Sequence, residues 1–152
     1  MLPIYHLISD ARSWNNGELM MPLYSIVLLA CLYYKILNGS DRSKGQGEGK
    51  NCDRNLTKAW YRFQGAAGTQ MSNACLSPRQ CSTHAPGWLF GMHPAVSEGA
   101  VYRRVCFSGD TCCQWSFDIR VRNCSSYYVY NFVPTPTCTL WYCGVKGRVH
   151  VS

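Results

Sequence analysis

Ten cysteines in 152 residues constrain the fold of this chain more than any other feature. Cytosolic compartments keep thiols reduced, so this density favours an oxidising environment and disulfide bonds. The alternative is a zinc protein, but zinc sites usually contain C-x2-C or H-x3-H pairs. The closest approach to such a pair is Cys81 with His84, and the adjacent Cys112 and Cys113 would be awkward ligands of one tetrahedral metal. We therefore predict disulfides, with no metal and no other cofactor.

The composition indicates one basic, folded domain. Hydrophobic residues make up 47% of the chain, including five Trp and ten Tyr, which is too apolar for a disordered protein. A net charge of +7 can attract polyanions, yet only Arg103 and Arg104 are adjacent cations. No nucleic-acid-binding motif is visible, so we predict a solvated basic surface and no nucleic-acid partner. The scattered cations include Arg42, Lys50, Arg54, Arg62, Arg79 and Arg120.

One strongly apolar run, residues 20–34, lies near the start of the chain. It is short for a transmembrane helix, which needs about 20 apolar residues. A signal peptide has an apolar h-region of about 7–15 residues. The run fits this description if translation starts at Met20 or Met21. No positively charged n-region precedes it. We interpret residues 1–30 as an N-terminal extension with a signal h-region at about 20–30. The alternatives are a membrane anchor at residues 20–37, and an upstream exon or a misassigned start that accounts for the first eighteen residues.

Strand signals dominate the rest of the chain. The aromatic segment at residues 60–63 indicates a short strand. In the segment 117–122, Phe, Ile and Val alternate with Asp118, Arg120 and Arg122, which predicts one buried and one solvent-exposed face. A turn at residues 123–126 then leads to a second strand at 127–133, rich in β-forming residues, and the two strands form a hairpin.

Loops separate the predicted strands. Residues 38–51 are rich in Gly, Ser and charge and indicate an exposed loop. Prolines and glycines between residues 78 and 99 indicate that the middle third of the chain is rich in loops. Together with the cysteines, these patterns predict a small, disulfide-rich, mainly β fold, with antiparallel hairpins, long loops and little helix.

Several motifs occur in a fixed order between the first and last cysteines. They are Cys31, W-Y-R-F at 60–63, C-C-Q-W at 112–115, Y-Y-V-Y at 127–130 and a C-x4-C pair ending at Cys143. This order resembles the cysteine-rich module shared by uromodulin, the zymogen-granule membrane glycoprotein and related extracellular proteins. The resemblance covers about 113 residues and all ten cysteines. It implies one module at residues 31–143, followed by a tail at 144–152.

The resemblance also implies a pairing scheme for the cysteines. The scheme joins Cys31 with Cys124, Cys52 with Cys138, Cys75 with Cys112, Cys81 with Cys143, and Cys106 with Cys113. Connectivity cannot be derived from sequence alone, but the scheme places the two vicinal cysteines in different bridges, as their geometry requires. Each of the two longest loops, of about 90 residues, would stabilise the fold by up to about 4–5 kcal/mol in the chain-entropy account.

Catalytic signals are sparse. There is no HExxH, GxSxG, P-loop or Rossmann glycine pattern. We interpret His84 and His93 as turn residues whose rings pack or form hydrogen bonds locally. A Cys–His catalytic pair would need a free thiol, and ten paired cysteines leave none. We predict no enzymatic activity; the rival interpretation, a small secreted hydrolase, requires His84 to lie beside a carboxylate in a deep pocket.

Three sequons could carry N-linked glycans, at Asn38, Asn55 and Asn123. Asn55 is the best candidate, whereas Asn123 is followed by a cysteine that can pair before the glycan is added. The resemblance implies a glycan that captures a bacterial adhesin, at positions that are Asn131 and Phe90 here. Neither position is a sequon in this chain, so only a glycan at Asn123 could take over that role.

We predict a secreted or cell-surface, non-enzymatic recognition or structural module with an extracellular protein or glycan ligand. The face with Arg120 and Arg122, the loops around Trp88 and any glycans are the candidate contact surfaces. The alternative is a secreted cationic defence protein that binds microbial or other anionic surfaces. That alternative fits the net charge, but the chain lacks a concentrated basic amphipathic face.

Overall fold

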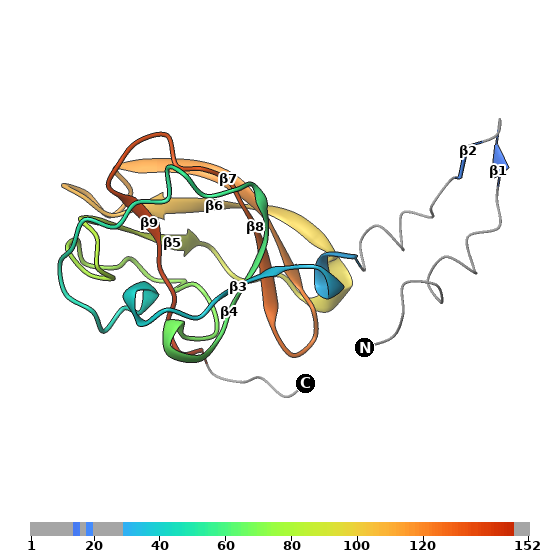
Figure 1. Ribbon diagram of the computed structural model, residues 1–152, viewed down its shortest axis with the longest axis horizontal. Helices are drawn as coiled ribbons and strands as arrows, with labels where there is room; N and C mark the ends of the chain where they lie inside the picture. The colour runs from blue at the N-terminus through green and yellow to red at the C-terminus, as the bar shows by residue number, and fades with distance from the viewer. Residues whose placement is uncertain (1–13, 16–17, 20–28, 148–152) are drawn as a thin grey trace.

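The computed structural model describes residues 14–15, 18–19 and 29–147 of the chain (Figure 1). The main element of the described chain is one seven-stranded sheet in the order β3–β4–β8–β7–β6–β5–β9. Its strands are β3 (Lys35–Leu37), β4 (Ala59–Phe63), β5 (Ala85–Phe90), β6 (Ala100–Phe107), β7 (Trp115–Asn123), β8 (Tyr128–Phe132) and β9 (Leu140–Tyr142). Two further short strands, β1 (Trp14–Asn15) and β2 (Glu18–Leu19), pair with each other.

Helix is limited to short turns within the described residues. Residues 29–32 form one helical turn, and three 3-10 turns follow. These are η1 (Ser40–Arg42), η2 (Gly65–Ala67) and η3 (Val96–Glu98). The sequence-based prediction of a small, mainly β, disulfide-rich fold with little helix is therefore confirmed.

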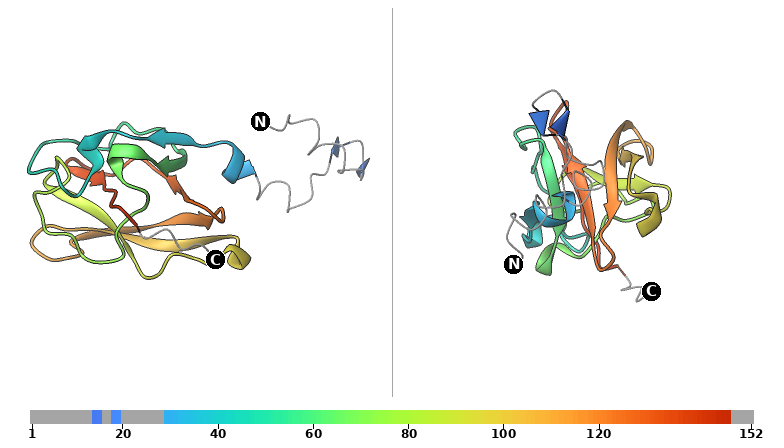
Figure 2. Two further views of the ribbon diagram at one scale, coloured as in Figure 1. Left: turned by 90° about the horizontal axis from the view of Figure 1, so that it is seen from below. Right: turned by 90° about the vertical axis from the view of Figure 1, so that its right-hand side faces the viewer.

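The sheet curls back on itself. Antiparallel pairs run from β4 through β8, β7 and β6 to β5, and a parallel strand adds at each edge. The left view of Figure 2 shows β3 and β4 on one side of the core and β6 and β7 on the other. The segments that follow the two edge strands meet, because the Gly144 N–H donates to the Arg42 carbonyl at 2.7 Å.

Aromatic rings fill the space inside the curled sheet. The rings of Tyr130, Phe132 and Tyr142 stack in series, with centroids 5.3 and 3.8 Å apart. All three side chains are fully buried, and each large apolar side chain contributes about 1.5–3 kcal/mol when taken out of water. The predicted hairpin supplies much of this core, since Ile119 and Val121 of β7 and the rings of β8 point inward.

Strand β5 lies in the part of the chain that was predicted to be rich in loops. Strand β5 escaped prediction because it is buried over five consecutive residues and so shows no alternation. It also contains Pro86, whose carbonyl still accepts a hydrogen bond from the Ser108 N–H at 3.1 Å. Gly87 is required there, because a Cβ would lie 2.7 Å from the Phe107 ring.

All ten cysteines lie within residues 29–147, and each is paired. The five bridges join Cys31 to Cys124, Cys52 to Cys138, Cys75 to Cys112, Cys81 to Cys143, and Cys106 to Cys113. They are the same pairs that the family resemblance implies. The first bridge attaches the N-terminal helical turn to the turn between β7 and β8, and so links the two sides of the curled sheet.

The predicted signal h-region at residues 20–30 lies outside the described residues except for its last two positions. Within the part of the chain that is described, no helix has both the length and the apolar character needed to cross a membrane.

Candidate ligand-binding face

The outer face of the sheet carries the exposed side chains of strand β7. Asp118 and Arg120 are exposed, whereas Ile119 and Val121 between and beside them pack into the core. Residues that pair across neighbouring strands point to the same face. The register of the sheet therefore identifies which side chains of β6, β8 and β4 share the outer face with Arg120.

One row of four side chains crosses this face. Tyr102 of β6 pairs with Arg120, Arg120 pairs with Asn131 of β8, and Asn131 pairs with Trp60 of β4. We call these four residues the Tyr102–Trp60 row. Adjacent strands lie about 4.8 Å apart, so the row spans about 14 Å. Tyr102 is 68% exposed, Arg120 is exposed, and Asn131 and Trp60 are partly exposed.

The polar groups of the row are available to a ligand. Among residues 29–147, the side chains of the row form no hydrogen bond with the protein. The Arg120 guanidinium lies 5.9 Å from the centre of the Tyr102 ring. The row thus presents an amide, a guanidinium, a phenol and an indole N–H, which together provide donors and acceptors.

A second, shorter row lies beside the first and contains the only carboxylate that the described strands place on this face. Phe90 pairs with Arg104, and Arg104 pairs with Asp118. The Arg104 Nε lies 3.5 Å from the Asp118 carboxylate, and Phe90 is 59% exposed. Asp118 therefore pairs with Arg104, whereas Arg120 has no acidic partner within 4 Å among the described residues.

Arg122 does not form part of the exposed face, so its predicted exposure is wrong. Only 9% of this residue is exposed, because the segment containing η3 packs over the end of β7 and brings Gly99 close to the guanidinium. Its Nε and Nη1 atoms are buried without a hydrogen-bond partner. Burial lowers the pKa of Arg122 from its ordinary value. The alternation correctly indicated its side of the sheet but could not reveal the covering loop.

Trp88 itself is buried, although the neighbouring Phe90 and Met92 in the predicted contact region are 59% and 81% exposed. Trp88 is 6% exposed, and its indole N–H donates to the Cys112 carbonyl at 2.8 Å. Trp88 packs with Leu76 and with the bridge between Cys81 and Cys143 in a second, smaller core. This second core covers one end of the outer face and leaves the Tyr102–Trp60 row open.

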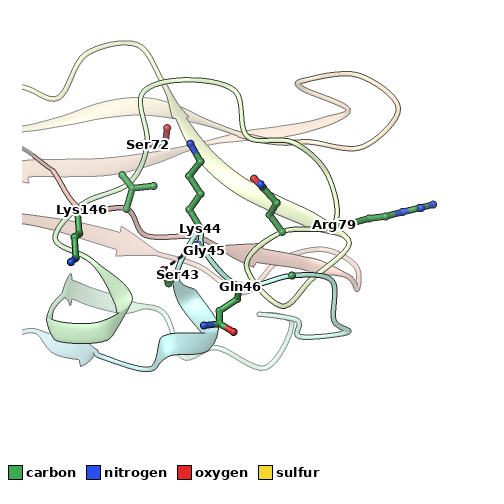
Figure 3. A pocket seen from close by; sticks show the side chains of 10 residues that line it. Ser43, Lys44, Gly45, Gln46, Ser72, Arg79 and Lys146 are labelled. Atoms are coloured by element: carbon green, nitrogen blue, oxygen red, sulfur yellow. Dashed lines mark hydrogen bonds between the residues drawn. The ribbon is translucent and has the colours of Figure 1, made fainter.

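A separate basic groove lies away from this face. It has a volume of about 890 Å³, and its lining includes three cations but no carboxylate. Figure 3 shows that the side chains of Lys44, Arg79 and Lys146 extend in different directions from the groove. The groove is therefore a region of positive potential, but its charged groups do not converge on one ligand atom.

Comparison with known proteins identifies the module. Residues 61–144 match the uromodulin-like domain family. This chain belongs to the uromodulin-like family. Uromodulin of Mus musculus is 43% identical to the chain over 115 residues, which cover 74% of the chain and 18% of uromodulin. The pancreatic secretory granule membrane major glycoprotein GP2 of Homo sapiens is 40% identical over 119 residues, which cover 76% of the chain and 22% of that glycoprotein.

The matches confirm the resemblance drawn from the cysteine pattern. The uromodulin-like chain spans about a fifth of the length of these relatives. Membership in the family supports an extracellular, non-enzymatic module. Among the described residues of the chain, no three His, Cys, Asp or Glu side chains are placed to hold a metal ion.

The two described histidines of the uromodulin-like chain have different surroundings. His84 lies 3.3 Å from the Glu48 carboxylate, but the two side chains are 51% and 53% exposed. This exposed pair does not meet the deep-pocket condition of the hydrolase interpretation. His93 is largely buried and forms hydrogen bonds with Asn73 and Tyr130, which are 20 and 37 positions away in the chain. Its ring therefore links distant segments, rather than bonding only within its own turn.

The three sequons of the uromodulin-like chain differ in the freedom of the asparagine amide. Asn38 and Asn55 are exposed. The Asn123 Nδ2 donates to the Pro94 carbonyl at 3.1 Å, and its Oδ1 accepts from the Ser125 N–H at 2.8 Å. A glycan on Nδ2 would disturb the first of these bonds in the folded domain.

We expect glycans at Asn38 and Asn55, and none at Asn123, when the chain is secreted from mammalian cells. The amides of Asn38 and Asn55 are exposed, whereas the Asn123 amide is hydrogen-bonded and lies next to the bridged Cys124. Intact mass before and after enzymatic deglycosylation checks this expectation. N38Q and N55Q should each remove one glycan, and N123Q should leave the glycan count unchanged. Conversion of Asn123 to aspartate by the deglycosylating enzyme, seen in the peptide map, would contradict it.

Proposed function

We propose that this uromodulin-like chain is an extracellular recognition module that binds its ligand along the outer face of its sheet, without catalysis. The observation that carries the proposal is the Tyr102–Trp60 row. Its side chains come from four hydrogen-bonded strands, face solvent together and have no protein partner for their polar groups among the described residues. Aromatic residues and arginine are enriched at the centres of binding surfaces.

Rigidity of the scaffold supports binding at this face. The row lies in the middle of the sheet, on strands β6, β7, β8 and β4, rather than on loops. Bridges attach segments at both ends of the face, through Cys31–Cys124 at one end and Cys106–Cys113 at the other. Preorganised side chains lose little conformational entropy on binding, so more of the contact energy appears as affinity.

Binding of the labelled, disulfide-intact chain to mammalian cell surfaces tests the proposal. We expect saturable binding that falls about tenfold or more in the double variant Y102S/R120Q, since loss of central contacts commonly costs over 1 kcal/mol. R79Q is the matched control, because it removes an exposed positive charge in the basic groove, away from the row. Absence of saturable binding, or equal binding by the double variant and the parent, would refute the proposal.

A second candidate function is binding to anionic surfaces through the basic groove. The lining of Lys44, Arg79 and Lys146 without a carboxylate favours it, as does the net charge of +7. We rank this function second, because the cationic side chains in Figure 3 diverge. Salt-sensitive binding to anionic vesicles that falls in R79Q but not in Y102S/R120Q would favour this function instead.

A further inference from the structure

We infer that the ligand of the Tyr102–Trp60 row is an acidic oligosaccharide, an inference that rests on the proposed function. The shape of the site is the first argument. The row is an open strip about 14 Å long, and its residues line neither the 890 Å³ groove nor the 540 Å³ hollow beside His84. A strip of this kind suits a short chain of sugar rings better than a compact molecule that needs an enclosed pocket.

The order of side chains along the strip is the second argument. Aromatic rings stand at its two ends, Tyr102 at one and Trp60 at the other, with Arg120 and Asn131 between them. The C–H faces of sugar rings pack against the electron-rich faces of aromatic rings. Sugar hydroxyls both donate and accept hydrogen bonds, and the Asn131 amide offers both kinds of partner. Trp60 and Tyr102 add an indole N–H and a phenol at the ends.

The charge on the face is the third argument and indicates an acidic sugar. Asp118 is occupied by Arg104 at 3.5 Å, which leaves Arg120 without an acidic partner among the described residues. The buried Arg122 lies two residues further along β7 and adds positive charge below the surface. A free guanidinium binds a carboxylate or a sulfate through two parallel hydrogen bonds. Arg120 is thus the residue expected to hold the acidic group.

Titration of the chain with three small oligosaccharides tests the inference. The probes are 3′-sialyllactose, 3′-sulfolactose and neutral lactose, and the readout is the affinity and the set of shifted amide resonances of the isotope-labelled, full chain. We expect at least one acidic probe to bind at least tenfold more tightly than lactose, with shifts in β6, β7 and β8. The sialylated and sulfated probes distinguish a carboxylate from a sulfate as the acidic group.

Variants separate the row from the general charge of the protein. R120Q should abolish the preference for acidic probes, Y102S should weaken both acidic and neutral probes, and R79Q should change neither. An equal loss in R79Q and R120Q would overturn the inference, because binding would then depend on bulk charge. Equal affinity for lactose and both acidic probes would overturn it as well.

Failure of this inference can be distinguished from failure of the proposed function. If no probe binds, while cell-surface binding of the chain persists and still falls in Y102S/R120Q, the inference is overturned and the proposed function stands. Enzymatic removal of sialic acid and sulfate from the cells should abolish the binding if the inference holds. If the chain does not bind cells at all, both are overturned.

Discussion

Replacement of Asp53 by alanine is expected to destabilise the domain by about 3–5 kcal/mol, the usual cost of removing one partner of a buried ion pair. The Arg42 guanidinium donates to the two oxygens of the Asp53 carboxylate at 2.8 and 2.7 Å. Asp53 is 2% exposed and Arg42 is 6% exposed. The carboxylate also accepts the backbone N–H of Tyr142 at 2.8 Å. D53A would therefore leave the buried Arg42 guanidinium without its anionic partner, although it still donates to the Tyr142 carbonyl at 3.0 Å. The buried Tyr142 N–H would lose its acceptor.

Urea unfolding under non-oxidising, non-reducing conditions measures this effect while the disulfides remain intact. The double variant R42M/D53N is a useful comparison, because it removes both charges and keeps an acceptor for the Tyr142 N–H. We expect it to be more stable than D53A, since a buried pair can often be replaced by uncharged groups at little cost. D118A, at the exposed pair with Arg104, is the matched control and should cost less than about 1 kcal/mol. A D53A variant within about 1 kcal/mol of the parent would contradict this account.

Local sequence patterns were sufficient to predict the fold class and one hairpin. One face of β7 packs into the core and the other contacts water, so apolar and polar residues alternate along the strand. This alternation can be read from the local sequence alone. The aromatic run of β8 and the aromatic strand β4 are likewise visible within five residues. The order and spacing of the cysteines and aromatic motifs pointed to the family, and residues 61–144 match its family model.

The buried arginines and the Tyr102–Trp60 row could not be predicted, because they depend on contacts between distant segments. Arg42 was predicted to be solvated, yet Asp53 and Tyr142 fix it in the interior. Of the row, only Arg120 was predicted to lie at a contact surface. Its partners Tyr102 and Trp60 share its face only through the register of four strands, which no local pattern records.

Acidification is expected to weaken the domain through His93. The Tyr130 hydroxyl accepts the Met71 N–H at 2.9 Å and can donate to the His93 Nε2 at 2.7 Å. The Nδ1 of His93 lies 2.9 Å from the Asn73 side-chain oxygen, to which it then donates. Burial, and secondarily the positive charge of Arg103, lower the pKa of His93 to about 4. The network thus fits a neutral imidazole, and a proton on Nε2 would displace the buried hydroxyl hydrogen of Tyr130.

The sign of the effect follows from the two pKa values of His93. The unfolded chain takes up a proton near the ordinary pKa of about 6.5, whereas the folded domain does so only near 4. Stability is therefore full above about pH 6.5 and is lost as the pH falls toward 4. Between pH 7 and pH 5 the expected loss is about 2 kcal/mol, at 1.36 kcal/mol per unit of difference. Over this interval most carboxylates remain ionised, so His93 should dominate the change.

Urea unfolding at pH 7, 6 and 5 measures this loss, and two variants assign it. H93Q cannot titrate, so its free energy of unfolding should change much less between pH 7 and pH 5 than that of the parent, whatever its stability at pH 7. H84Q removes a histidine that is half exposed and should retain the pH dependence of the parent. A pH dependence in H93Q equal to that of the parent would show that another group causes the loss. Because the Tyr130 ring stacks 5.3 Å from Phe132 in the main core, protonation of His93 would disturb the centre of the domain rather than a peripheral loop.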